Sequence, residues 1–499
     1  MSTSVFPRAV AVSPVQLGHP DEIYLGGAWD SPVGGGRIEV VSPSTEEVLI
    51  TVAEATEADM DAAVAAARAA FDHGPWPRLS YPERAEYLRR LAAALREREP
   101  RLARAWVDQT GALAVAAPFV VGAGTAWFDY YADLAATFPA EEAVHPGAAV
   151  FREPMGVVAA IAPWNNPYGI MAGKIAPALL AGCTVVMKPA PETPVEAHLI
   201  AEAAEEIGLP PGVLNLVPAH RDASDHLVRN PGVDKVSFTG SVAAGQHIAS
   251  VCGDRLARYT LELGGKSAAI VLDDYDVEDA ADTLVRTITA STGQVCATLS
   301  RVVVSKHRRD ALADAVRERF AALRVGDPFD PATDMGPLSM ARQRDRVESY
   351  VEAGRAEGAT LAHGGGRPTD LERGFYVEPT LFTDVEPGMR IAQEEIFGPV
   401  LSMLTCTSVD EAVEIANDSP YGLYGAVFTH DEALARSVAR SVRAGTIAHN
   451  GFRFDPSVPF GGFKHSGVGR EGGLEGLLAY TEAKSFLTAG GTSETGGSQ

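Results

Sequence analysis

Cysteine is scarce in this sequence, and the few cysteines are scattered. The 499 residues include four, at positions 183, 252, 296 and 406, and no two of them form a C-x-x-C pair. Zinc ribbons and disulfide frameworks need cysteines at short, repeated spacings, so neither is indicated and we expect no metal site. Unpaired cysteines suit a reducing compartment, and we therefore expect a cytoplasmic protein.

Positive charge is also in short supply. Lysine and arginine total 42 against 65 acidic residues, which gives a formal net charge of −23. Such a chain repels a polyanion such as DNA on average, so nucleic acid is not an expected partner. A phosphate-bearing ligand must instead be held locally, by helix N-termini and individually placed lysines.

Long apolar runs are missing as well. The most apolar long segment, GIMAGKIAPALLAGCTVVM, is interrupted by Lys174 and Pro177 and changes from helix-like to strand-like composition. A buried helix followed by a buried strand explains it better than a membrane span. The run AVAV before Pro14 is too short for the core of a signal peptide. We therefore expect no association with a membrane.

What remains is the composition of a soluble globular protein, with 46% apolar and 21% charged residues. A chain of this length is too long for one ordinary core, so at least two domains are expected. Near the N-terminus, residues 52–71 are predicted to form a helix in which Thr56 and Asp59 make a capping box. A second helix is predicted over 81–99, with proline in its first turn.

From Gly156 onward, short apolar runs alternate with helical patterns. The predicted strands are 156–163, 184–190, 212–219 and 233–240, and the predicted helices are 168–182, 193–208, 223–230 and 241–253. Thr193 is expected to cap the second of these helices, with Pro194 at its first position. The alternation is typical of a parallel sheet covered on both faces, as in dinucleotide-binding folds, although the usual G-x-G-x-x-G is absent.

A second alternation begins near Ser267. The predicted strands are 267–274, 301–306, 399–408 and 424–431, and the predicted helices are 277–291 and 309–323. This pattern indicates a second α/β domain.

One cysteine lies where chemistry is plausible. Cys296, in the stretch STGQVCATLS, follows the first long helix of the second domain and lies near the domain junction, where small-molecule sites are common. A thiol with an ordinary pKa of about 8.5 needs a base or a positive neighbour to act as a nucleophile at pH 7. Glu262, at the end of an apolar strand in LELGGKS, is the candidate base. Taken alone, each has a plainer interpretation, as a buried apolar thiol and a solvated strand-end carboxylate.

Several motifs together make the interpretation specific. LELGGKS at 261–267 and GQVCAT at 293–298 resemble the glutamate and cysteine signatures of the NAD(P)-dependent aldehyde dehydrogenase superfamily, and the 34 residues between Glu262 and Cys296 match that family. Further similar motifs follow in family order. They are PWNNP at 163–167, KPAPETP at 188–194, FTGSVAAG at 238–245, EEIFGPV at 394–400, PFGGFKHSGVGRE at 459–471 and YTEAKS at 480–485. The resemblance covers nearly the whole chain.

The resemblance implies an α/β fold with a Rossmann-like cofactor domain, a second α/β catalytic domain and a small β oligomerisation extension. The implied boundaries are 1–127 and 149–262 for the cofactor domain, 263–460 for the catalytic domain, and 128–148 with 476–488 for the oligomerisation segments. Residues 489–499, rich in glycine and serine, are expected to form a flexible tail. A homodimer or homotetramer is expected, because an unpaired extended strand is an aggregation hazard in a monomer.

The resemblance also implies catalytic roles. Cys296 would attack an aldehyde, hydride would pass to the nicotinamide, and the resulting thioester would be hydrolysed. Asn165 would join the Cys296 backbone N–H in an oxyanion hole, and Glu262 would be the general base. Relatives that pass the thioester to coenzyme A usually lack this glutamate, so release of a free acid is favoured. A coenzyme A-acylating enzyme, a catalytically silent homologue and a secondary cysteine esterase activity remain as alternatives.

Cofactor residues follow by the same resemblance. Lys188 would reach the adenosine ribose, Gly240 and Ser241 would begin a helix at the pyrophosphate, and Glu395 and Phe397 would hold the nicotinamide ribose and ring. The remaining implied positions are Pro163, Trp164, Glu192, Gly245 and Leu263. Many NAD-preferring relatives carry glutamate three residues after the lysine, but this chain has Pro191 there, with Glu192 next. NAD is the expected cofactor, and the displaced carboxylate leaves NADP possible.

The substrate is implied least directly. The corresponding tunnel positions are Asn166, Tyr168, Gly173, Ala290, Val295 and Phe452. Because Gly173 and Ala290 stand where some relatives hold bulky aromatics, we expect room for a medium or bulky apolar aldehyde, aromatic or terpenoid. No carboxylate-binding arginine is evident next to Cys296, which disfavours semialdehyde acids.

Overall fold

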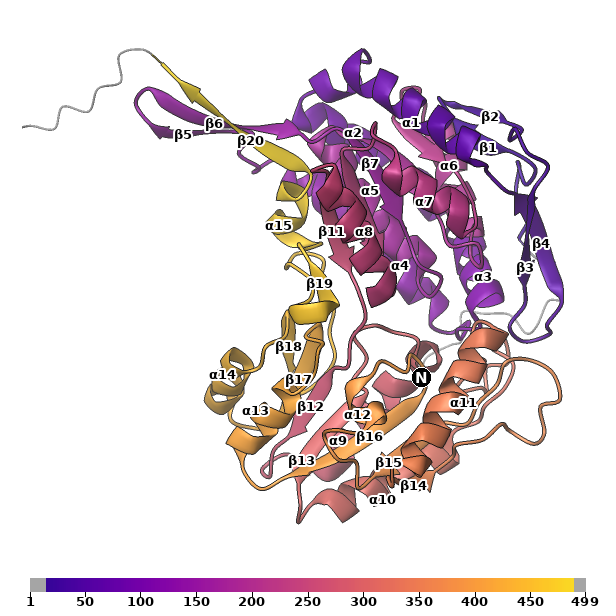
Figure 1. Cartoon of the computed structure of the whole chain (residues 1–499), viewed down its shortest axis with the longest axis vertical. Helices are drawn as coiled ribbons and strands as arrows, with labels where there is room; N and C mark the ends of the chain where they lie inside the picture. The colour runs from indigo at the N-terminus through magenta and orange to yellow at the C-terminus, as the bar shows by residue number, and fades with distance from the viewer. Residues whose placement is uncertain (1–14, 489–499) are drawn as a thin grey trace, which may run out of the picture.

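The computed structural model describes residues 15–488, and the predicted tail at 489–499 lies outside them. Sheets of eight and seven strands form two separate halves, and a three-stranded sheet projects from the first half as an arm (Figure 1). This arrangement confirms the predicted α/β fold class with two large units and a small β extension. No helix among the described residues is both long and apolar enough to cross a membrane.

The first sheet has a Rossmann-like core. Its parallel strands run in the spatial order β9–β8–β7–β10–β11, which is the order 3-2-1-4-5 along this part of the chain. Every residue of β7 and β8 is buried, because helices cover both faces of the sheet. The strands are β19 (Gly467–Val468), β11 (Arg258–Glu262), β10 (Lys235–Thr239), β7 (Val157–Ile161), β8 (Thr184–Lys188), β9 (Leu214–Leu216), β1 (Ile23–Leu25) and β2 (Ala28–Asp30).

Six helices around this sheet match predicted ones in type and approximate place. They are α1 (Glu57–Asp72), which begins later than the predicted residue 52, α2 (Tyr81–Glu97), α5 (Pro167–Ala181), α6 (Val195–Glu206), α7 (Arg221–Arg229) and α8 (Val242–Asp254). The sequence did not predict η1 (Trp76–Arg78), α3 (Glu99–Thr110) and α4 (Ala117–Leu134). The capping box of Thr56 and Asp59 on α1 is confirmed. The predicted cap of α6 is wrong, because Pro194 occupies the N-cap position and the buried Thr193 hydroxyl has no hydrogen-bond partner.

The second sheet is parallel except for one edge strand, β14, which is antiparallel to β15. Its strands, in spatial order, are β14 (Thr360–His363), β15 (Thr380–Thr383), β16 (Val400–Cys406), β13 (Arg301–Ser305), β12 (Ala268–Val271), β17 (Tyr424–Phe428) and β18 (Thr446–His449). The helices of this half are α9 (Val277–Thr289), η2 (Ala290–Gly293), α10 (Arg309–Ala322), α11 (Ala341–Ala356), α12 (Arg390–Gln393), α13 (Val409–Asn417) and α14 (Glu432–Ser441).

The arm consists of β5 (Glu141–His145), β6 (Ala148–Pro154) and the last strand, β20 (Thr481–Leu487), which pairs antiparallel with β6 and extends away from both halves (Figure 1). All residues of β5, and those of β20 from Glu482 onward, are exposed. The predicted boundary after residue 127 falls inside α4, whose helical sequence continues without a breaker to Leu134. The chain returns to the arm through η3 (Lys464–Ser466) and α15 (Gly473–Leu478), and a separate pair, β3 (Arg37–Val41) and β4 (Val48–Ala53), lies near the N-terminus.

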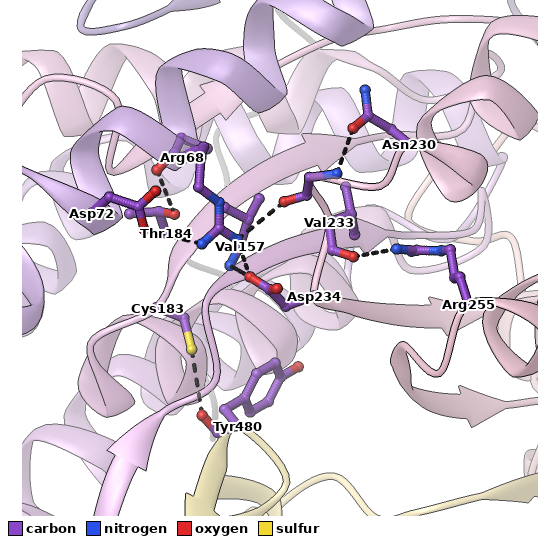
Figure 2. Close-up of polar contacts among 12 residues, drawn as sticks. Arg68, Asp72, Val157, Cys183, Thr184, Asn230, Val233, Asp234, Arg255 and Tyr480 are labelled. Atoms are coloured by element: carbon purple, nitrogen blue, oxygen red, sulfur yellow. Dashed lines mark hydrogen bonds and ion pairs between the residues drawn. The ribbon is translucent and has the colours of Figure 1, made fainter.

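An acidic side chain joins the two central strands of the first sheet at their amino ends. Asp234, just before β10, accepts a hydrogen bond from the backbone N–H of Val157 in β7 (2.7 Å) and pairs with Arg68 of α1 (Figure 2). Gly156 permits this approach, since its φ is +133° and a Cβ there would lie 1.8 Å from Asp234 Oδ2. The cluster fixes β7 against β10, the pair between which the strand order reverses.

The linker between the halves sets how they face each other. The chain leaves the carboxyl end of β11 at Glu262 and enters the amino end of β12 at Ala268 after five residues. β19 then returns to pair with β11, opposite Leu261 and Glu262. The carboxyl edge of the first sheet therefore meets the amino edge of the second.

Candidate active site

A cavity of about 450 Å³ lies where these two edges meet. It is lined by Pro163, Trp164, Asn165, Ile170, Thr239, Gly240, Ser241, Leu263, Gly264, Cys296, Arg342, Gln343, Arg346, Glu395 and Phe397. The loops that follow β7 and β10 supply its wall on the first sheet. In open α/β sheets, ligands bind at this place, outside the carboxyl ends of the strands where the order reverses.

Cys296 is half-buried in the wall of the cavity, and the segment before it has an unusual backbone. Ser291, Thr292 and Gly293 have φ values of +46°, +55° and +73°, a region that side-chain-bearing residues rarely adopt. The Thr292 hydroxyl holds this conformation by donating to the carbonyl of Gly336 (2.9 Å). Such strain persists only where the surroundings enforce it, and it is concentrated at functional sites.

Asn165 lies across from the cysteine loop. Its side-chain Nδ2 donates to the carbonyl of Gln294 (2.8 Å), two residues before Cys296, and its own carbonyl accepts from the indole N–H of Trp106 (3.2 Å). An amide nitrogen has two hydrogens, so one remains to serve a ligand atom. Because Asn165 and Cys296 line one cavity, an amide donor and a thiol face the same space.

Two glycines let the linker pass between catalytic candidates. A Cβ on Gly264 would lie 2.4 Å from Glu395 Oε2, and a Cβ on Gly265 would lie 2.3 Å from the carbonyl oxygen of Cys296. The Gly265 N–H donates to Glu395 Oε1 (2.9 Å). The GG pair of LELGGKS is therefore required by close packing of backbone against both neighbours.

Glu262 is a buried carboxylate without a hydrogen-bond partner on either oxygen. Burial raises its pKa well above the ordinary value, and the negative charge of Glu471 raises it further, while Lys174 and Arg470 act in the opposite direction. Lys174 is fully buried in α5, and its Nζ donates to Glu471 Oε1 (2.6 Å). A carboxyl that prefers to be protonated is suited to exchange a proton near neutral pH.

The surroundings of the Cys296 thiol favour its protonated form. Burial raises the pKa of Cys296 to about 12, with the charges of Glu395 and Glu262 adding to the effect. Burial likewise raises the pKa of Glu395 to about 7, against the hydrogen bond from Gly265. A nucleophilic Cys296 therefore needs a proton acceptor, because no neighbouring cation lowers its pKa.

The first sheet also supplies groups suited to a phosphate. Ser241 is the N-cap of α8, where its hydroxyl accepts from the backbone N–H of Ala244 (3.3 Å), and both Ser241 and Gly240 line the cavity. The N-terminus of a helix of this length attracts anions through its free N–H groups and its dipole. Lys188 ends β8, and burial lowers its pKa to about 8 while Glu192 opposes that change.

A family model described as the aldehyde dehydrogenase family matches residues 29–486. The chain belongs to this family. Geranial dehydrogenase from Castellaniella defragrans is 46% identical over 477 residues, which are 94% of this chain and 98% of that protein. An aldehyde dehydrogenase from Mycobacterium tuberculosis, solved with NAD⁺, superposes with a TM-score of 0.92 at 42% identity, over 96% of this chain and 100% of that one. A mutant of aldehyde dehydrogenase C from Pseudomonas syringae, solved with NAD⁺ and octanal, superposes with a TM-score of 0.93 at 40% identity. This match covers 96% of this chain and 99% of that one.

Nine of the predicted cofactor and catalytic residues of this aldehyde dehydrogenase line the cavity. They are Pro163, Trp164, Asn165, Gly240, Ser241, Leu263, Cys296, Glu395 and Phe397. Gly245 does not line it but lies beneath Leu263, where a Cβ would be 2.6 Å from that side chain. Glu262 and Lys188 are buried and do not line the cavity, and Glu192 pairs with a lining residue, Arg342.

Six lining residues of the aldehyde dehydrogenase were not predicted. They are Ile170, Thr239, Gly264, Arg342, Gln343 and Arg346. Three of these come from α11, whose sequence ARQRDRVESYVEAGRA is an ordinary charged helix. Its one unusual feature is arginine at 342 and 346, one turn apart, on the side that faces the cavity. Gln343 Nε2 donates to the carbonyl of Phe397 (2.6 Å), which ties the helix to the cavity wall.

The predicted substrate positions do not lie together, and none of them lines this cavity. Asn166 caps α5, and Tyr168 is buried with its hydroxyl hydrogen-bonded to that of Thr125 (2.8 Å). Val295 is half-buried beside Cys296, and Ala290 is exposed. Phe452 packs on Tyr424 and lines a second cavity of about 530 Å³.

The room expected beside Gly173 is absent. Trp127 of α4 fills that space, since a Cβ on Gly173 would lie 3.1 Å from the Trp127 ring. Trp127 meets Phe454 edge to face (5.7 Å), and Phe454 meets Phe460 in the same manner (5.6 Å). The sequence pattern around Gly173 does not reveal this aromatic wall, because Trp127 lies 46 positions earlier, in another helix.

Proposed function

We propose that this aldehyde dehydrogenase oxidises a medium or bulky apolar aldehyde to the free carboxylic acid, with NAD as the hydride acceptor. One observation carries the proposal. Cys296 and the amide of Asn165 line a single cavity at the reversal point of a Rossmann-like sheet, with the partnerless carboxyl of Glu262 buried behind it.

Cys296 is the nucleophile. After its thiol loses a proton to Glu262, the sulfur bonds to the aldehyde carbon, and the carbonyl oxygen becomes the oxyanion of a thiohemiacetal. The Asn165 amide and the Cys296 backbone N–H stabilise this oxyanion, and loss of one such donor typically costs about 10²–10³ in rate. Addition must come first, because the tetrahedral carbon releases hydride as the carbonyl re-forms.

NAD, when bound, accepts that hydride with its electron pair. A thioester remains on Cys296. Glu262 first releases the proton that it took from the thiol to solvent, which restores its carboxylate. It then removes a proton from water, the water oxygen adds to the thioester carbon, and the carbon–sulfur bond breaks. The carboxylic acid leaves and the sulfur regains a proton, so aldehyde, water and oxidised cofactor yield acid, reduced cofactor and a proton.

The chain's residues fit a dinucleotide. The N-terminus of α8, with Gly240 and Ser241, suits the pyrophosphate, and Lys188 suits the adenosine ribose. Glu395 suits the nicotinamide ribose, while Phe397, edge to face with Trp164 at 5.3 Å, suits the ring. The two solved relatives described above contain NAD⁺, which supports the same cofactor in this enzyme.

The substrate class is supported by chemistry and by relatives. Trp127, Phe454 and Phe460 form an apolar wall near the buried Lys174–Glu471 pair, since Phe460 exchanges backbone hydrogen bonds with Glu471. The relative from C. defragrans is named for geranial, a terpenoid aldehyde, and the P. syringae structure contains octanal.

We also propose a cytoplasmic homodimer or homotetramer that associates through the arm. The fully exposed β5 and the exposed β20 leave two open strand edges, which a second subunit can cover.

Coenzyme A acylation is the second candidate, and Glu262 disfavours it because hydrolysis needs this base. Stimulation of NADH formation by coenzyme A would favour it. A silent homologue and a main esterase activity would show no cofactor reduction.

The test follows absorbance of the reduced cofactor with citral, octanal, benzaldehyde and acetaldehyde. Cys296→Ala should abolish turnover, and Cys406→Ala, which removes a buried thiol in β16, should leave it nearly unchanged. Undiminished turnover in Cys296→Ala would overturn the mechanism. A larger kcat/KM for acetaldehyde than for citral or benzaldehyde would overturn the substrate class alone.

A further inference from the structure

Glu192 and Arg342 form an ion pair that joins the two halves of the chain beside the cofactor cavity. Glu192 lies in the loop between β8 and α6, and Arg342 lies in the first turn of α11. The Arg342 side chain is 66% exposed, and that of Glu192 is 23% exposed. An ion pair this open to water adds little to stability, so stability does not account for it.

Glu192 interacts with two cations. One is Arg342, with which it forms the ion pair, and the other is the buried Lys188, whose ammonium interacts with the Glu192 charge. These three groups together carry two positive charges and one negative, in a chain whose overall charge is −23.

We propose that Arg342 and Glu192 set the choice between NAD and NADP, with Arg342 binding the 2′-phosphate of NADP and Glu192 competing with that phosphate for Arg342. The inference rests on the proposed function, in which the cavity binds the dinucleotide. With NAD, Arg342 stays paired with Glu192. With NADP, the phosphate takes the place of the Glu192 carboxylate between Lys188 and Arg342.

The chemistry of the groups supports this exchange. A guanidinium binds phosphate through two parallel N–H donors, as it does a carboxylate, so the same face of Arg342 serves both partners. Pro191, three residues after Lys188, carries no charge to repel a phosphate. The carboxylate one position later is already neutralised by Arg342, which weakens its repulsion toward the 2′-phosphate.

Calorimetric titration of the full-length protein tests the proposal without turnover. The ligands are NAD, NADP, 5′-AMP and 2′,5′-ADP, and the last pair differs only in the phosphate at issue. Arg342→Ala should lower the affinity for NADP and 2′,5′-ADP by about tenfold and leave NAD within about twofold. Glu192→Gln should raise the affinity for NADP by about tenfold. Arg355→Ala, which removes an equal charge from the far end of α11, is the control.

The outcomes separate the two hypotheses. Failure of the wild type to bind NAD would overturn the proposed function itself. NAD binding with NADP affinity unaltered in both Arg342→Ala and Glu192→Gln would overturn only the role of this pair. Arg342→Lys should lose most of the NADP affinity that the guanidinium provides, since one ammonium cannot form the paired contact. Equal weakening of NAD and NADP would show that Arg342 merely shapes the cavity, and would also overturn the proposal.

Discussion

At the scale of single residues, the site depends on carboxyl groups held in unfavourable surroundings. Glu262 has neither a hydrogen bond nor solvent to stabilise its charge. Glu471 raises the pKa of Glu262, and Lys174 lowers it. Its raised pKa means that the base form accumulates only as pH rises. Activity limited by this base should therefore increase with pH on the acidic side of the profile.

Replacing either member of the buried pair should move that acidic limb in opposite directions. Glu471→Gln removes a negative charge and leaves the Lys174 ammonium unbalanced, so the pKa of Glu262 falls and the limb moves to lower pH. Lys174→Met removes a positive charge, so the limb moves to higher pH. The measurement is kcat against pH for each variant, with thermal unfolding recorded in parallel, because loss of a buried partner costs about 3–5 kcal/mol. Shifts of the same sign in both variants would exclude electrostatic control of Glu262.

At the scale of secondary-structure elements, a large side chain of α4 fills the space that a large side chain on α5 would otherwise occupy. Trp127 fills the space over Gly173, so a bulky residue at 173 has nowhere to go. Gly173→Leu should destabilise the protein by about 1–3 kcal/mol through overpacking. The double variant with Trp127→Ala should recover part of that loss, and urea unfolding of both single variants and the double variant measures the coupling. Strict additivity would show that the two side chains do not compete for this space.

The sequence predicts a helix or strand well when the pattern that specifies it lies within that element. Strands such as β7 and β8 are continuous apolar runs, and α1 begins with a capping box. Each can therefore be predicted from its own residues. The predicted cap of α6 fails because Pro194 itself takes the N-cap position and the buried Thr193 hydroxyl has no hydrogen-bond partner. No local pattern marks α11 as part of the site.

The residues of the candidate site also fall into those that a local motif predicts and those that only the fold reveals. Cys296, Glu262 and Asn165 lie in motifs that can be recognised one at a time. Arg342 and Trp127 act through contacts with residues far along the chain, at Glu192 and Gly173, and only tertiary packing brings those together. Linear motifs therefore locate the chemistry, whereas the walls that select cofactor and substrate require the fold.

At the scale of the whole molecule, the arm presents apolar side chains to solvent. Leu487 and Phe486 at the end of β20 are 74% and 50% exposed. Leu487→Asp should dissociate the proposed oligomer, because it places a charge where a partner would bury apolar surface. Light scattering after size exclusion gives the mass, and Val33→Asp, at an 80% exposed position away from the arm, is the control. An unchanged mass in Leu487→Asp would remove this strand from the interface.

The buried pair of Lys174 and Glu471 also bears on how the protein is made. The two residues are 297 positions apart in the chain, and a ribosome adds about 5–20 residues per second, so the lysine is synthesised roughly 15–60 s before its counter-charge. A buried ammonium without a partner is costly, so α5 cannot settle fully onto the first sheet during that interval. Each nascent chain therefore passes through a stage in which most of its length has been synthesised but the buried lysine of α5 still lacks its counter-charge.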